Sequence, residues 1–152
     1  MKYLFALLLL VGTSAHSAAQ DLKLSGQLIL KELGAVPATV ELKLTKENKK
    51  KLIYDGILMA EIRTLFPNHN IRFVVKKNKN KIEGLSETEL KGRDTVRIVL
   101  KGKLSSLAVN EKLNFSVSMY AYEERCDILD PSDCHEMPRY LDSGTAEFTV
   151  VE

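Results

Sequence analysis

The segment that decides the predicted fold is Leu113–Val151, LNFSVSMYAYEERCDILDPSDCHEMPRYLDSGTAEFTVV. Its first part alternates between apolar and polar side chains, and one face carries Leu113, Phe115, Val117, Met119 and Ala121. After a turn-forming Asp-Ser-Gly the alternation returns with Ala146, Phe148 and Val150. A period of two is typical of a half-buried strand. The segment therefore predicts two strands that flank a loop with both cysteines of the chain.

The same alternation recurs upstream and predicts further strands at Leu22–Lys31, Thr39–Thr45, Ile71–Lys76 and Asp94–Lys101. Gly26 interrupts the first of these and predicts a bulge. The segment Leu52–Phe66 has spacings that fit either a helix or a strand. We favour a strand, because Leu58–Phe66 would form a hairpin with the strand Ile71–Lys76.

Two polar segments separate these strands and are predicted as connections. Glu32–Ala38 contains Gly34 and Pro37, and Lys77–Gly92 has few apolar residues. The result is about seven or eight short strands without a long helix. This pattern predicts an all-β fold, an antiparallel immunoglobulin-like β-sandwich in which one disulfide brackets a loop.

The first nineteen residues have the features of a signal peptide. A positive start at Lys2 precedes the apolar run Leu4–Val11 and the small residues Ser17-Ala18-Ala19. We therefore expect residues 1–19 to be removed and residues 20–152 to form a single domain, periplasmic or secreted. No later apolar segment approaches the roughly 20 residues of a membrane-spanning helix. Export argues against a nucleic-acid partner and favours a protein partner in the cell envelope.

Charge is distributed unevenly along the chain. Lys43–Lys51 contains five lysines and one glutamate, Arg72–Lys81 carries five bases and no acid, and Glu123–Glu136 has six acids against Arg125 alone. One interpretation is solvated loops at sheet ends, where lysines on edge strands also prevent aggregation. The alternative is a surface with two poles that meets a charged partner or an anionic membrane surface.

The two cysteines, Cys126 and Cys134, are expected to form a disulfide, since an exported protein folds in an oxidising compartment. Asp130-Pro131-Ser132-Asp133 between them predicts a β-turn, with Pro131 at its second position. Such a turn brings the cysteines together, and closing the loop would stabilise the fold by roughly 2–3 kcal/mol. The six acids nearby oppose formation of a reactive thiolate.

The order of features from Tyr120 to Pro138 resembles one known family. A strand with Tyr120 and Tyr122 at its end, Cys126, an acidic loop, Cys134 and Pro138 is similar to the amino-terminal periplasmic domain of transmembrane thiol:disulfide interchange reductases. The resemblance covers roughly the last 60 residues. It implies an immunoglobulin-like domain whose cysteine pair passes electrons to other periplasmic proteins.

The sequence thus supports two hypotheses of different classes. The first is a non-catalytic exported binding protein in which Cys126 and Cys134 form a structural disulfide. The alternative is a thiol–disulfide electron carrier with the same two cysteines as its catalytic pair. Tyr120 and Tyr122 could cap the cysteines or form a platform for a ligand. No cofactor or metal is expected, because the acids lack the spacing of a calcium loop and the two histidines beyond the signal peptide lie far apart. One of them, His69, lies in the predicted turn Pro67-Asn68-His69-Asn70 and is expected to be exposed.

Overall fold

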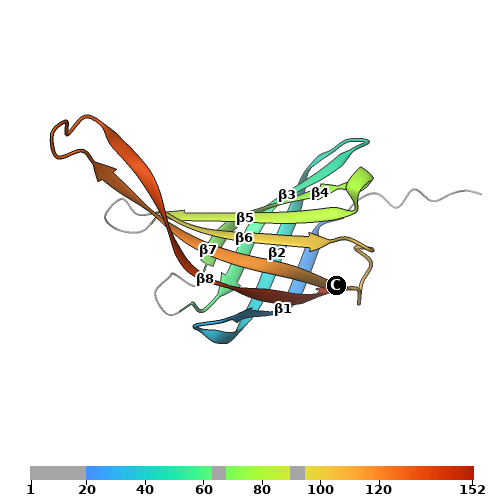
Figure 1. Cartoon of the computed structure of the whole chain (residues 1–152). Helices are drawn as coiled ribbons and strands as arrows, with labels where there is room; N and C mark the ends of the chain where they lie inside the picture. The colour runs from blue at the N-terminus through green and yellow to red at the C-terminus, as the bar shows by residue number, and fades with distance from the viewer. Residues whose placement is uncertain (1–19, 63–67, 90–94) are drawn as a thin grey trace, which may run out of the picture.

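The computed structural model describes residues 20–62, 68–89 and 95–152, and these form an all-β protein of eight antiparallel strands (Figure 1). The predicted signal peptide, residues 1–19, lies outside the described residues. The strands are β1 Leu22–Leu30, β2 Gly34–Glu47, β3 Lys51–Ala60, β4 Asn68–Lys76, β5 Lys81–Glu89, β6 Thr95–Lys103, β7 Lys112–Cys126 and β8 Cys134–Val151. A single 3₁₀ turn, η1 (Lys77–Lys79), joins β4 to β5. Among the described residues, no helix is long and apolar enough to cross a membrane.

The strands close into a barrel, so the predicted immunoglobulin-like sandwich is wrong, while the antiparallel all-β class and the strand number are confirmed. Each strand pairs with its neighbours in sequence, and β1 pairs with β8 from Lys23↔Val151 to Leu30↔Gly144. A sandwich would need strands that cross between two sheets. Alternation predicts that one face of each strand is buried, but it does not tell whether a second sheet or the far wall of a barrel covers that face.

The barrel interior is occupied by apolar side chains from all eight strands. Those fully buried include Leu24, Leu28, Val40, Leu58, Phe73, Ile82, Ile98, Leu100, Leu113 and Phe148. Three phenylalanines link opposite walls, because Phe115 contacts Phe73 at 5.8 Å and Phe148 at 6.0 Å between ring centroids, both edge to face. Eight strands leave an interior just wide enough for side chains to fill. The alternating residues predicted to point inward in β1, β2, β7 and β8 are buried, except Leu44 of β2, which is partly buried against the core.

Two predicted connections are strands in the structure. Most of the segment predicted as the loop Lys77–Gly92 forms β5, which pairs with β4 and β6. The connection predicted at Glu32–Ala38 contains a turn and then the start of β2 at Gly34. Proline is tolerated at position 37 because pairing with β3 begins only at Ala38. The choice of a strand over a helix in Leu52–Phe66 is confirmed as far as Ala60. The strand begins at Lys51, earlier than the favoured Leu58–Phe66, and residues 63–66 lie outside the described residues.

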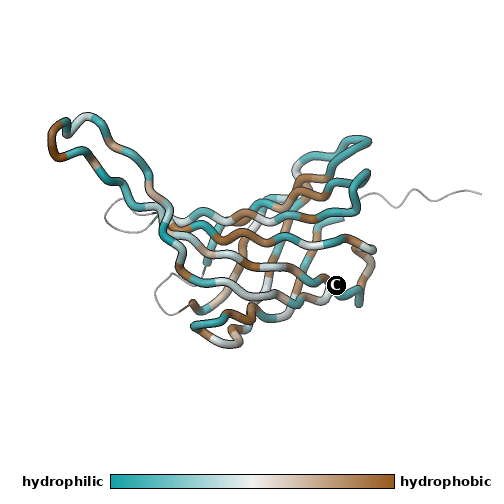
Figure 2. The backbone as a smooth tube through the Cα atoms, viewed as in Figure 1, coloured by the Kyte–Doolittle hydropathy of each residue, from teal (hydrophilic) through white to brown (hydrophobic). Residues whose placement is uncertain are grey.

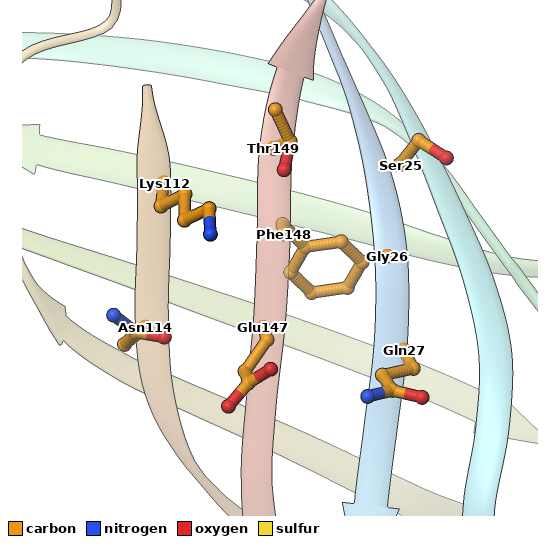
Figure 3. Close-up of a pocket in the computed structure, with 8 residues that line it drawn as sticks. All are labelled: Ser25, Gly26, Gln27, Lys112, Asn114, Glu147, Phe148 and Thr149. Atoms are coloured by element: carbon orange, nitrogen blue, oxygen red, sulfur yellow. The ribbon is translucent and has the colours of Figure 1, made fainter. Parts of the chain in front are cut away.

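Gly26 does not form the predicted bulge, since the pairing of β1 with both neighbours continues through it. It faces Phe148 of β8, whose ring lies beside it in Figure 3. A Cβ atom at position 26 would lie 1.8 Å from the carbonyl oxygen of Glu147 and 2.9 Å from the Cα of Phe148. The strands therefore approach so closely here that only glycine fits.

The barrel has two ends with different connections. The β2–β3 and β4–β5 turns and the β6–β7 connection lie at one end, which we call the lysine end. At the other end β7 and β8 run on past the barrel wall (Figure 1). Because β7 is antiparallel to β6, Phe115 lies opposite Gly102 near the lysine end and Tyr122 lies opposite Thr95 at the other end.

Candidate functional site: a disulfide-closed arm

Residues 123–140 form a two-stranded arm that projects from the barrel (Figure 1). The pairing of β7 with β6 ends at Tyr122, and the pairing of β8 with β1 ends at Gly144. Beyond these points β7 and β8 pair with each other as far as Cys126↔Cys134. The arm is therefore held by one ladder, without a neighbouring strand on either side among the described residues.

The root of the arm contains an irregularity that is fixed by Asp142. Pairing shifts between Met119 and Tyr120, so Leu141 on β8 has no partner and packs partly against the core. The buried carboxylate of Asp142 accepts hydrogen bonds from the backbone N–H of Ser143 at 2.7 Å and of Glu32 at 3.2 Å. Bulges bend a strand and increase its twist. The irregularity at Leu141 marks where the hairpin leaves the barrel wall, and the hydrogen bond from Glu32 to Asp142 connects this point to the β1–β2 turn.

The two tyrosines singled out by the sequence lie at this root and contact other groups. Tyr120 packs edge to face on Tyr140 with ring centroids 6.1 Å apart. Arg97 of β6 lies over the ring of Tyr122 at 4.0 Å, and its Nε is 2.6 Å from a carboxylate oxygen of Glu87. Both tyrosines precede Cys126 by at least four positions, which is about 13 Å along a strand. They stabilise the root, and the structure places them away from the sulfurs.

The predicted disulfide joins Cys126 to Cys134, eight positions apart, and the predicted β-turn lies between them. The N–H of Asp133 donates to the carbonyl of Asp130 at 3.0 Å, and the N–H of Asp127 donates to the carbonyl of Asp133 at 2.9 Å. Side-chain carboxylates complete the loop, since Asp127 accepts from the N–H of Leu129 at 2.9 Å. Residues 127–133, which we call the tip, thus form a closed and hydrogen-bonded loop.

Two large apolar side chains stand at the tip and were not recognised as functional from the sequence. Ile128 is 95% exposed and Leu129 is 94% exposed, and Figure 2 shows this as a hydrophobic segment at the far end of the arm. Met137 and Tyr140 are half exposed along the arm. A signal was available, because an Ile-Leu pair is unusual in a turn composed otherwise of polar residues and proline.

The apolar pair is surrounded by carboxylates. Asp127, Asp130 and Asp133 belong to the tip, and hydrogen bonds from Ser132 hold the pKa of Asp130 below its usual value. Glu123 is paired with Arg139 at 3.1 Å. A carboxylate oxygen of Glu124 lies within 4.8 Å of both sulfurs. Glu124, Cys126 and Cys134 form the one group of three candidate metal ligands in the described part of the chain, but the two sulfurs are bonded to each other in the disulfide.

Polar side chains also lie inside the barrel, toward the arm. His69, predicted to sit in an exposed turn, is only 1% exposed because β4 begins one residue earlier and directs it inward. Its Nδ1 lies 3.0 Å from the hydroxyl of Thr88. Its Nε2 and the hydroxyl of Ser86 have no hydrogen-bond partner among the described residues. Burial lowers the pKa of His69 below its usual 6.5.

We expect His69 to make the barrel sensitive to mild acid. Below pH 6.5 the unfolded chain takes up a proton on this histidine that the folded chain resists, so stability falls as pH falls. The slope attributable to one such proton is at most about 1.4 kcal/mol per pH unit. Urea denaturation between pH 7 and 5 should show this loss, and His69→Gln should flatten it. The exposed His135→Gln serves as the control, and an unchanged slope in His69→Gln would assign the loss elsewhere.

The outer wall carries shallow hollows with different chemistry. One lies over β1, β7 and β8 and is lined by polar side chains that include Gln27, Asn114 and Glu147 (Figure 3). A second lies toward the lysine end, where Lys81, Lys101, Lys103 and Lys112 surround Gly102 and Leu104. A third is flanked by the half-exposed Ile57 and Leu85. The second is the most basic of the three.

Comparison of the chain with protein-family models, curated proteins and solved structures finds no match. The resemblance to thiol:disulfide interchange reductases therefore stays a prediction.

Proposed function

We propose that this chain is an exported, non-catalytic binding protein whose arm carries the binding surface. The observation that carries the proposal is the almost complete exposure of Ile128 and Leu129 at the end of a projecting hairpin. Single exposed apolar residues are common on protein surfaces, but two adjacent ones at the end of a projecting hairpin are positioned to enter a partner. Fully burying a leucine or isoleucine stabilises a complex by about 1.5–3 kcal/mol.

The construction of the arm supports a binding role. The disulfide and the hydrogen bonds of the tip hold the two side chains in one arrangement before a partner arrives. A preorganised loop loses less conformational entropy on binding, so more of the contact energy remains as affinity. Export is part of the proposal, and it is supported by the disulfide, which is typical of oxidising compartments, and by the signal-like sequence of residues 1–19.

Photo-crosslinking from the tip tests the proposal in intact cells. A benzophenone amino acid at position 129 should give adducts in the envelope fraction, whereas the same probe at position 85 on the barrel wall should give few. Leu85 is a matched position because it is also apolar and 44% exposed. Ile128→Ser in the probe-bearing chain should remove the adducts without lowering the melting temperature, since its side chain contacts water. Equal labelling from both positions would contradict a binding role for the tip.

One observation favours the electron carrier as a second candidate. Cys126 is exposed and Cys134 is partly exposed, so the disulfide at the end of the arm is accessible to another thiol. The nearby carboxylates weigh against it, because they disfavour a thiolate. The reduction potential of the pair discriminates the two roles. Structural disulfides lie below about −300 mV, and a clearly higher value would favour the carrier.

A further inference from the structure

Four lysines lie directly opposite one another across neighbouring strands at the lysine end. Lys51 of β3 faces Lys76 of β4, Lys76 faces Lys81 of β5, and Lys81 faces Lys103 of β6. All four are on the outward face, because the residues next to each in its strand point inward or end the strand. We call this set the lysine row. Only Lys76 has an ion pair within the described residues, at 2.6 Å to Glu83.

The closed barrel changes the interpretation of these lysines. Lysine on an edge strand prevents sheet-to-sheet aggregation, but β3, β4, β5 and β6 each have partners on both sides and none is an edge. Like charges directly opposite across a ladder destabilise it. The row therefore costs stability in the free protein, and a negatively charged partner would relieve that repulsion.

The hollow beside the row offers a place for such a partner. We call it the lysine hollow, and its lining places Lys81, Lys101, Lys103 and Lys112 around the half-buried Leu104, the one apolar side chain among the residues that line it. Gly102 also lines the hollow, and a Cβ there would point inward toward the ring of Phe115. Its one acid, Glu83, is already paired with Lys76, and the lysines around it keep the pKa of Glu83 low. The hollow thus combines a cationic rim with one apolar side chain, that of Leu104.

The tip of the arm has the complementary arrangement. Ile128 and Leu129 form an apolar centre, and the same loop carries the carboxylates of Asp127, Asp130 and Asp133. The hollow flanked by Ile57 and Leu85 matches the tip less well, because its Arg72 is paired with Asp55 at 2.6 Å. Charge complementarity of this kind selects partners and speeds association.

We infer that the occupant of the lysine hollow is the tip of a second copy of this chain. The inference rests on the proposed function and names the partner of the arm. Arm and hollow lie at opposite ends of one barrel, so an arm reaches the hollow of another copy (Figure 1). The contact joins two different surfaces and is therefore heterologous, which produces head-to-tail chains unless a ring closes. Such a small contact is expected to be weak and sensitive to salt.

Sedimentation of the purified chain 20–152 with its disulfide intact tests the inference. The average mass of the wild type should rise with protein concentration. It should fall back to the monomer value in about 1 M salt, where exposed charges interact over only roughly 3 Å. A tip variant, Ile128→Ser with Leu129→Ser, and a hollow variant, Lys103→Glu with Lys112→Glu, should each remain monomeric. Lys31→Glu with Lys43→Glu changes the net charge equally at the β1–β2 turn and on β2, outside the lining of the hollow, and should associate like the wild type.

Mixing the tip variant with the hollow variant, neither of which should associate alone, gives the decisive result. The hollow variant keeps a functional tip and the tip variant keeps a functional hollow, so an equal mixture should form a complex of two copies and nothing larger. Any one of three results would overturn the inference. The hollow variant could associate like the wild type, the mixture could stay monomeric, or the wild type could be monomeric at every concentration.

Two further outcomes separate this inference from its alternatives. Binding of the monomeric wild type to anionic phosphatidylglycerol vesicles, without self-association, would overturn it and assign the lysines to a membrane surface. If the adducts formed from the tip contain a different protein and no second copy of this chain, the inference is also overturned. The proposed binding role of the arm would then remain intact. Absence of any tip adduct would instead count against the proposed function itself.

Discussion

Gly26→Ala should destabilise the barrel by at least about 3 kcal/mol, at or above the upper end of the usual cost of overpacking. The new Cβ would lie 1.8 Å from the carbonyl oxygen of Glu147, and this obstacle is backbone rather than a movable side chain. Relief requires β1 to move away from β8, and the β1–β8 ladder is the one that closes the barrel. We therefore expect a large loss of stability in urea denaturation, or a chain that does not fold.

Two controls give this prediction its scale. Ser25→Ala changes the neighbouring outward position and should alter stability little. Gly34→Ala adds a Cβ that meets no atom within 4 Å but must adopt a φ of +77°, which costs roughly 1–2 kcal/mol. The expected order of destabilisation is Ser25→Ala, then Gly34→Ala, then Gly26→Ala. If Gly26→Ala unfolds at the same urea concentration as Ser25→Ala, the close approach of β1 and β8 is wrong.

The strands that the sequence predicted are those whose inward positions are apolar. Leu24, Val40 and Phe115 alternate with polar residues, and each is buried. β5 was missed because its inward positions after Ile82 are Gly84, Ser86 and Thr88, so the apolar alternation disappears. Gly84 is small for a reason of packing, since the ring of Phe73 lies 2.8 Å from where its Cβ would be. Long-range packing thus removed the local pattern that would have identified the strand.

Closure and projection depend on pairings that local patterns do not contain. The barrel closes through Leu24↔Val150, which joins the two ends of the described chain. The arm projects because β6 and β1 end before β7 and β8 do, which no residue within the arm specifies. The turn and the disulfide between Cys126 and Cys134 were predictable, since both depend on residues close in sequence. The lysine row could not be predicted, because it depends on the register of four strands.

Removing the disulfide with Cys126→Ser and Cys134→Ser should separate the two candidate roles. If the bond is structural, its loss should lower stability by roughly 2–3 kcal/mol, because the unfolded chain regains the entropy of a short loop. Amide protons of the tip, residues 127–133, should also exchange faster, since no neighbouring strand holds the arm. The barrel should remain folded, and its buried amides, such as that of Phe115, should stay protected at moderate urea concentration.

The wild type treated with a phosphine reductant is the matched control, because it lacks the crosslink without any substitution. It should unfold at the same urea concentration as the double variant. Self-association should weaken in both, since the apolar pair Ile128 and Leu129 is no longer held in one arrangement. Under the electron-carrier hypothesis, the double variant would instead retain most of its stability and lose all thiol exchange with a partner. Equal denaturation curves for the double variant and the oxidised wild type would therefore favour the carrier, whereas a stability loss with an ordered barrel favours a disulfide that shapes a binding tip.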